Sequence, residues 1–310
     1  MNIHKKFFSR IGFSYLIFGL FILLVTVVVM NSAGSINSNL LNNINFTTIL
    51  SAICNYVLPF PALYFLLKKI DTRPIEKKNL SIATFLKYIA ITLTLMWIGN
   101  IIGLIVTAEI GFVLQTDVSN PVENLITNSD IWMNLLLISI IAPIFEEIFF
   151  RKLLIDRTIK YGAKISILLS AILFGFFHGN LNQFFYTFLM GGFFAYVYIK
   201  TGKVIYTIGL HIAVNLLGSV ISVLVVASAE NLIAGTYAPL DMAIILAYLI
   251  FLITAMIIGI VSLYKFKKSK LDETKTEIPL ENPLKTAILN PGMIFFMLFF
   301  AFQMACQIIA

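Results

Sequence analysis

The chain has 310 residues, of which 59% are hydrophobic and only 12% are charged. A soluble domain is about half apolar and about a quarter charged, so a water-soluble globule could not cover this much apolar surface. A disordered chain would not carry it either. The net charge of +7 is typical of membrane proteins with basic cytoplasmic loops, and it does not indicate a nucleic-acid partner. We therefore expect an all-α polytopic protein that forms one integral membrane domain over 1–310, surrounded by lipid bilayer.

A helical span needs about 20 mostly apolar residues to cross the hydrocarbon core. Such segments recur along the whole chain, and the fifth of them is short and contains glycines. We therefore expect a bundle of eight or nine transmembrane helices. The candidate segments are 11–30, 46–67, 82–108, 131–157, 164–178, 183–200, 204–227, 241–264 and 286–309.

The connections between these segments alternate in charge, which predicts their orientation. Lys and Arg gather in the N-terminal ten residues and in every second connection after them, whereas the connections 31–45, 109–130 and 228–241 contain neither. Positively charged loops stay on the cytoplasmic side of a cell membrane. The pattern predicts a multi-pass protein of the cell membrane with a cytoplasmic N-terminus, and nine spans would place the C-terminus outside.

Two adjacent carboxylates, Glu146 and Glu147, lie in a run that is apolar from Ala142 until Arg151. An ionisable group inside a span costs about 2.5–3.5 kcal/mol on insertion scales, so each one is a candidate functional residue. Glu147 and Arg151 have the i,i+4 spacing of a helical ion pair, whereas Glu146 points about 100° away from Glu147. A purely structural reading, an ion pair beside a glutamate that reaches the polar interface, stays open from this motif alone.

Two histidines lie inside later apolar segments, each with a partner one helical turn away. His178 follows Phe174 by four residues, and His211 precedes Asn215 by four. A single histidine in a span is more often a packing residue than a catalytic one. Two of them, with an aromatic ring and an amide at helical spacing, favour a functional cluster.

Helix geometry predicts that these groups lie at one depth in the membrane. Glu146 precedes the turn at Gly162 by sixteen residues and His178 follows it by sixteen, so both lie about 24 Å along their helices from that turn. From the next turn on the same side, His211 and Asn215 are about 13 and 19 Å away. We therefore expect an active site buried between the middle helices, opening toward the cytoplasm.

A carboxylate as general base, two orienting imidazoles and an amide as oxyanion donor together make up a hydrolase for an acyl bond. The sequence contains no G-x-S-x-G motif, and its two cysteines, Cys54 and Cys306, lie in other spans. The nucleophile is then an activated water molecule. A His₂Glu zinc site formed by His178, His211 and Glu146 is an alternative, although the H-E-x-x-H signature is absent and we expect neither a metal nor a cofactor.

At these residues the chain resembles the CPBP family of CAAX-protease and bacteriocin-processing intramembrane endopeptidases, also known as Abi or type II CAAX prenyl endopeptidase-like proteins. The family pattern is E-E-x-x-x-R, then F-x-x-x-H, then H-x-x-x-N on successive membrane helices. All three motifs occur here in that order, as Glu146–Arg151, Phe174–His178 and His211–Asn215. The resemblance covers about 130–225, which we expect to be the catalytic helical core.

The resemblance implies a metal-independent glutamic endopeptidase. In that reading Glu146 activates water with the help of His178, His211 and Asn215 stabilise the oxyanion, and Glu147 and Arg151 organise the site. Phe174 organises it as well. The implied substrates are membrane-associated: prenylated CaaX-type proteins, pheromones or bacteriocin-type peptides. A non-enzymatic bacteriocin-immunity or transporter-like protein using the same polar cluster remains the alternative from a different class.

Overall fold

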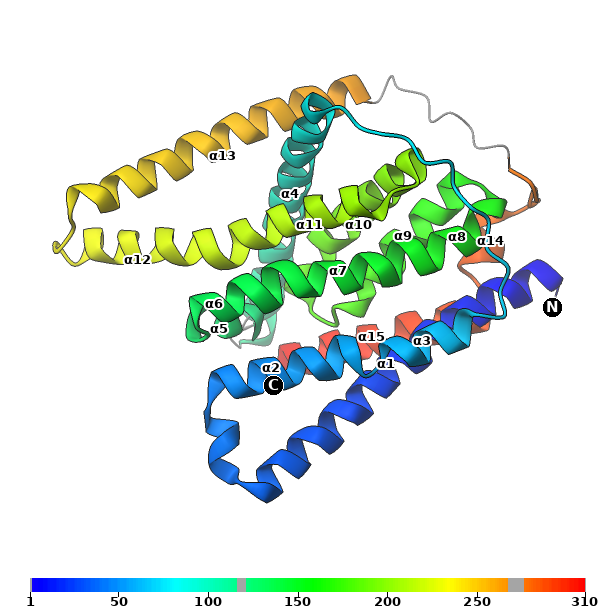
Figure 1. Ribbon diagram of the computed structural model, residues 1–310, viewed down its shortest axis with the longest axis horizontal. Helices are drawn as coiled ribbons and strands as arrows, with labels where there is room; N and C mark the ends of the chain where they lie inside the picture. Colours follow the sequence, from blue (N-terminus) through cyan, green and yellow to red (C-terminus); the bar gives the residue numbers. More distant parts are fainter. Residues whose placement is uncertain (1, 116–120, 267–275, 310) are drawn as a thin grey trace.

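The computed structural model describes residues 2–115, 121–266 and 276–309, and within these ranges the regular structure is helical, without strands. The expected all-α fold is confirmed (Figure 1). The helices are α1 (Ile3–Ile36), α2 (Ile44–Ala52), α3 (Phe60–Leu67), α4 (Ile82–Leu114), α5 (Pro121–Asn128), α6 (Ile131–Met133), α7 (Ala142–Glu147), α8 (Leu154–Thr158), α9 (Ala163–Phe177), α10 (Leu181–Thr201), α11 (Val204–Leu216), α12 (Ser222–Ile233), α13 (Pro239–Phe266), α14 (Pro283–Ala287) and α15 (Pro291–Ile309).

Several of these helices run on into one another through π-helical turns, in which the backbone hydrogen bonds reach back five residues instead of four. Such turns join α2 to α3, α6 to α7, α7 to α8, and α11 to α12. Seven of the resulting continuous helices in the described residues are long and apolar enough to cross a membrane. Helix α9, with 15 residues, is about 22 Å long and falls short of the thickness of a bilayer core. The prediction of eight or nine spans therefore depends on α9 and α10, which lie in the interior of the bundle.

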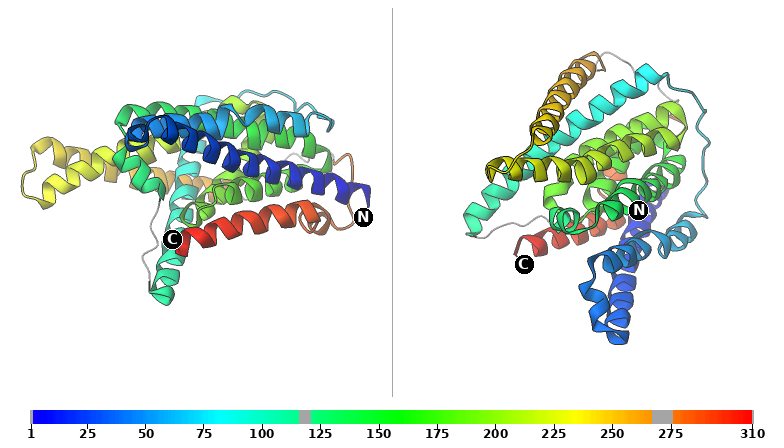
Figure 2. Two further views of the ribbon diagram at one scale, coloured as in Figure 1. Left: turned by 90° about the horizontal axis from the view of Figure 1, so that it is seen from below. Right: turned by 60° about the vertical axis from the view of Figure 1, so that its left-hand side comes forward.

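The middle of the molecule is formed by α7, α9, α10 and α11 (Figure 1). Helices α1, α3 and α15 lie on one side of them, and the hairpin of α12 and α13 lies on the other side, as the turned views also show (Figure 2). The segments that carry the expected site are therefore the ones that other helices cover.

Small residues allow the closest helix contacts in this bundle. Gly99 of α4 lies against the backbone of Tyr186 in α10, and Gly103 lies against the carbonyl group of Asn182. Such small-x-x-x-small spacing lets membrane helices approach without a side chain between them. The close approach fixes α10, which packs against the site helix α9 on its other side.

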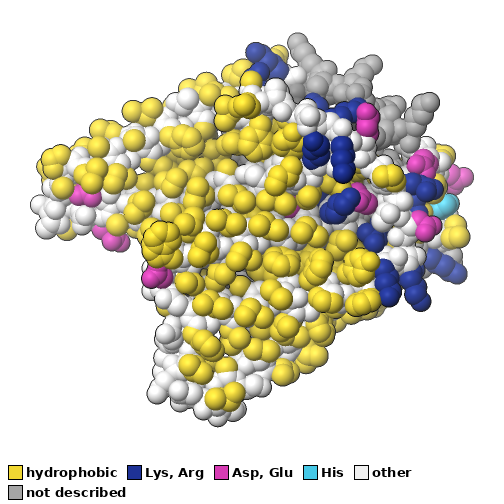
Figure 3. Space-filling view, viewed as in Figure 1, with side chains coloured by type: hydrophobic (Ala, Val, Ile, Leu, Met, Phe, Trp, Pro, Cys, Tyr) yellow, Lys and Arg dark blue, Asp and Glu magenta, His cyan; other side chains and the backbone are white. Residues whose placement is uncertain are grey.

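Charged side chains gather at one end of the molecule. Figure 3 shows Lys and Arg side chains at the end that carries the N-terminus, while the rest of that face is mostly hydrophobic. This distribution agrees with a band of lipid-facing surface next to one basic end. The assignment of the basic end to the cytoplasm remains a prediction.

An extended strap, residues 71–81, crosses this basic end between α3 and α4. The Arg73 amide donates to the Asp156 carbonyl oxygen over 2.6 Å, and the Lys78 amide donates to the Thr201 carbonyl oxygen over 2.8 Å. Gly202, whose φ of 60° ends α10 in the left-handed region, lies directly under the strap. The strap therefore forms hydrogen bonds to α8 and to the end of α10, where the chain turns into α11.

Candidate active site

Glu147 and Arg151 form the ion pair that their i,i+4 spacing predicts. The Arg151 Nε lies 3.0 Å from Glu147 Oε2, and Arg151 Nη2 donates to Glu147 Oε1 over 3.2 Å. Both side chains are completely buried. A charge in such a place requires its partner, because an unpaired buried ion costs several kcal/mol.

Three further groups hold the Arg151 guanidinium, and they come from α9 and α10. Arg151 Nη1 donates to the Ser170 hydroxyl over 2.7 Å, and Ser170 in turn donates to the Phe150 carbonyl oxygen over 2.9 Å. The guanidinium also lies over the rings of Phe174 and Phe194, 4.5 and 5.6 Å from their centroids. Cation–π contacts and a satisfied hydroxyl make this a rigid support for Glu147.

His211 links the glutamate pair to α11. Its Nδ1 lies 3.0 Å from Glu147 Oε1, and its Nε2 lies 3.7 Å from Glu146 Oε2. Since a carboxylate accepts hydrogen bonds, the Nδ1 atom carries a hydrogen and the Nε2 atom faces Glu146. Glu147 therefore orients His211 in addition to pairing with Arg151, a contact that the sequence did not indicate.

His178 stands at the end of α9 and shares an aromatic neighbour with His211. Its Nδ1 lies 2.8 Å from the Phe174 carbonyl oxygen, which can only accept, so the Nε2 atom of the neutral ring is left as an acceptor. The Phe174 ring makes edge contacts to both imidazoles, with centroids 4.8 Å from His178 and 5.7 Å from His211. Phe174 thus brings the two expected histidines to one place.

Asn215 lies one helical turn beyond His211, and its amide is partly committed. Its Nδ2 donates to the Ile138 carbonyl oxygen over 2.9 Å. Ser139 and Ser219 lie beside it and exchange a hydrogen bond of 2.8 Å. Ile138 and Ser139 belong to the π-helical turn Asn134–Ile141, and Ser219 belongs to the π-helical turn Leu217–Ile221. One amide hydrogen of Asn215 therefore holds α11 against the glutamate-bearing helix.

Glu146 receives a hydrogen bond from a residue that the sequence analysis did not identify. The Tyr56 hydroxyl donates to Glu146 Oε1 over 2.9 Å, across ninety residues of sequence. The Glu146 side chain is 16% exposed, whereas Glu147 is completely buried. Among the described residues, Glu146 is therefore the member of the pair that forms no ion pair with a Lys or Arg, and its side chain is the partly exposed one.

The zinc alternative requires Glu146, His178 and His211 to converge on one point. In the part of the chain that the structure describes, no three His, Cys, Asp or Glu side chains are grouped as metal ligands. Glu147 Oε1, the carboxylate atom nearest to His211, is already shared with Arg151. The described side chains are arranged for hydrogen bonding among themselves rather than around a common centre.

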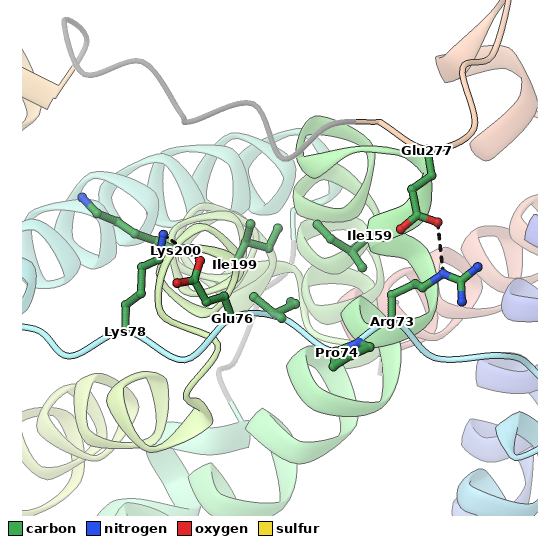
Figure 4. A pocket seen from close by; sticks show the side chains of 9 residues that line it. Arg73, Pro74, Glu76, Lys78, Ile159, Ile199, Lys200 and Glu277 are labelled. Carbon is green, nitrogen blue, oxygen red and sulfur yellow. Dashed lines mark hydrogen bonds and ion pairs between the residues drawn. The ribbon is translucent and has the colours of Figure 1, made fainter.

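A separate cleft of about 180 Å³ lies under the strap at the basic end (Figure 4). Arg73 and Glu277 form an ion pair of 3.0 Å at its rim, and the side chains of Ile159 and Ile199 line its wall. Ile159 follows Glu146 by thirteen residues on the same continuous helix, which is about 20 Å. The cleft is therefore not part of the glutamate–histidine cluster.

Comparison with known protein families finds a match over the segment that carries these residues. Residues 128–217 match the family model of Rce1-like type II CAAX prenyl endopeptidases, and this range contains all seven expected site residues. No curated protein and no solved structure matches the chain significantly. The segment 128–217 is therefore similar to the domain of type II CAAX prenyl endopeptidases, which are membrane proteases, and this similarity supports the resemblance seen in the three motifs.

Proposed function

We propose that this protein is an intramembrane endopeptidase of the glutamic type, in which Glu146 activates water to hydrolyse a peptide bond of a membrane-associated substrate. The observation that carries the proposal is the difference between the two glutamates. Glu147 is buried and bound to Arg151 and His211, whereas Glu146 is partly exposed and, among the described residues, forms no ion pair with a Lys or Arg. A general base must be accessible to water, and of the two carboxylates only that of Glu146 is partly exposed.

In the proposed reaction, Glu146 takes a proton from a water molecule whose oxygen attacks the carbonyl carbon of the scissile bond. A tetrahedral intermediate forms, and the proton then passes from Glu146 to the departing amide nitrogen as the carbon–nitrogen bond breaks. The Nε2 atom of His178, an acceptor when Nδ1 donates to Phe174, accepts a hydrogen bond from the second hydrogen of the water, which stays on the attacking oxygen and ends on the new carboxyl group. Each proton is thereby accounted for without a covalent enzyme intermediate.

The oxyanion of this intermediate needs donors, and two groups on α11 supply them in the proposal. The second amide hydrogen of Asn215 is one donor. His211 becomes the other when the proton that Glu146 has taken from water moves to its Nε2 atom, 3.7 Å from Glu146 Oε2, and the same proton returns through Glu146 to the leaving nitrogen. While His211 holds this proton, Glu147, 3.0 Å from its Nδ1 atom, balances the charge of the ring. Each donor aimed at a developing oxyanion lowers the activation free energy by about 3–4 kcal/mol.

The proposed substrate class rests on the family match and on the place of the site between helices. Prenylated CaaX-type proteins, pheromones and bacteriocin-type peptides are all anchored in or near a membrane, which would present them to a site between helices. The family match supports the first of these most directly. In the proposal, substrates reach the site from the basic end, which the charge pattern assigns to the cytoplasm.

The proposal is tested by purifying the protein in detergent and offering it a panel of membrane peptides: prenylated CaaX-type peptides, the same peptides without the lipid, and leader-type peptides. The proposal predicts cleavage of at least one class by the wild-type protein and none by Glu146→Ala. A chelator such as 1,10-phenanthroline should leave the rate nearly unchanged, because the carboxylate needs no metal to accept the proton. Stoichiometric zinc in the purified protein, inactivation by the chelator and recovery with zinc would together contradict it.

A further inference from the structure

Tyr56 reaches the glutamate cluster from a span that lies outside the family match. It belongs to the continuous helix Ile44–Leu67, whereas the match covers 128–217. Its hydroxyl donates to Glu146 Oε1 over 2.9 Å. Since the other carboxylate oxygen, Oε2, is the one that faces His211, the two oxygens of Glu146 have different surroundings.

The Tyr56 ring is fixed by stacking, so that its hydroxyl has little freedom. The ring lies 5.8 Å from that of Phe145, the residue before Glu146, at an interplanar angle of 22°. Phe60, one turn further along the same span, contacts Phe145 at 6.1 Å and Phe149 at 5.9 Å. Two aromatic residues of one helix thus pack against two aromatic residues of the other, which sets the register between the two helices.

The backbone around Tyr56 is also unusual. Tyr56 lies in the π-helical turn Ile53–Val57, where the Leu58 amide donates to the Ile53 carbonyl oxygen five residues back. Pro59 follows this turn, and because proline has no amide hydrogen, the Asn55 carbonyl group has no donor four residues ahead. Single π-helical turns inside α-helices are frequent at functional sites.

We infer that Tyr56 is a positioning residue for Glu146: its hydroxyl binds Oε1 and thereby presents Oε2 to the water and to His211. This inference rests on the proposed function. A glutamate side chain turns easily about its last bond, and a carboxylate held at one oxygen by a rigid donor has a defined orientation. The first spans of the chain therefore complete the site instead of only enclosing it.

The test compares Tyr56→Phe with the control Tyr64→Phe. Both variants lose a tyrosine hydroxyl from the same span, but Tyr64 lies on its lipid-facing side and is 47% exposed. A hydrogen bond to a charged group predicts that kcat falls by about 10- to 100-fold in Tyr56→Phe, with KM and the melting temperature close to wild type. Tyr64→Phe should retain the wild-type kcat. A variant with 3-fluorotyrosine at position 56 keeps the phenolic hydroxyl as hydrogen-bond donor and should retain most of the wild-type kcat.

The result separates this inference from the proposed function. If Glu146→Gln is inactive while Tyr56→Phe keeps kcat within about two-fold of wild type, Tyr56 has no positioning role and the general base stands. A loss of rate in Tyr56→Phe that is matched by a loss of thermal stability would also overturn the inference, since the hydroxyl would then be structural. If Glu146→Gln turns over normally, the base assignment itself fails, whatever Tyr56→Phe does.

Discussion

Glu146 and Glu147 are neighbours in the sequence, yet their carboxylates differ in burial and in the residues that they contact. Glu147 is completely buried between Arg151 and His211, and Glu146 is 16% exposed with Tyr56 as its hydrogen-bond donor. Because adjacent helical residues point about 100° apart, one carboxylate is completely buried and the other is partly exposed. In the proposed function, Glu147 is therefore the structural anion and Glu146 the reactive one.

This difference predicts separate effects on stability. Replacing Glu147 by Ala leaves the buried Arg151 unpaired, and breaking a buried ion pair in this way costs about 3–5 kcal/mol. The melting temperature of the purified Glu147→Ala variant should fall clearly below that of the wild-type protein. Glu146→Gln is the control, because Glu146 forms no ion pair with a Lys or Arg among the described residues and glutamine still accepts from Tyr56, so this variant should melt like the wild type. Equal melting temperatures for the two variants would show that the glutamates are wrongly sorted.

At this scale the local contacts were predictable from the sequence and the distant ones were not. Glu147 and Arg151 are four residues apart on one helix, so spacing alone indicates their ion pair. The contact of His211 with Glu147 depends on how α11 packs against α7, and spacing carries no information on that. Tyr56 looked like one aromatic residue among many in an apolar span, and only the packing brings its hydroxyl to Glu146.

At the scale of the elements, the expected helices are present, but their details follow from packing rather than from hydropathy. The segments predicted at 131–157 and 204–227 are continuous helices that contain π-helical turns, and these turns have no hydropathy signal. They occur where α7 and α11 carry the site, so each turn adjusts the register of the side chains around it. The segment predicted at 164–178 is a helix that is too short to cross a bilayer by its length alone.

The contact of α4 with α10 yields a prediction for this scale. A methyl group at Gly99 would lie 2.3 Å from the Tyr186 Cα, a position that is not open to a carbon atom. Gly99→Ala should therefore push the two helices apart and lower stability by about 1–3 kcal/mol, read as a lower melting temperature. At Gly192, on α10 itself, the nearest atom would be 3.6 Å away, so Gly192→Ala is the matched control and should be tolerated. A Gly99→Ala variant as stable as Gly192→Ala would contradict the close packing.

On the scale of the whole molecule, the basic end and the hydrophobic body together predict how the protein sits in a membrane. Lys and Arg side chains gather at the end that carries the N-terminus and the strap (Figure 3). The connection around Ser38–Asn42 has no basic residue and lies at the far end of α1. The positive-inside rule then assigns the strap to the cytoplasm and this connection to the outside.

Cysteine labelling in intact cells tests this orientation. In a protein without Cys54 and Cys306, cysteines introduced by Asn39→Cys and Thr72→Cys both replace exposed residues. A membrane-impermeant maleimide should modify the first variant in intact cells and the second only after the membrane is made permeable. The reverse result would place the basic end outside and would contradict entry of substrates from the cytoplasm.

The most direct test of the account is the turnover of Glu146→Gln on a peptide that the wild-type protein cleaves. Glutamine has the size and hydrogen-bonding capacity of the glutamate and still accepts from Tyr56, but it cannot take a proton from water. Since general-base catalysis contributes about 10²- to 10⁴-fold, the rate should fall by at least that factor while the melting temperature stays at the wild-type value. A folded Glu146→Gln variant with near wild-type turnover would contradict Glu146 as the base.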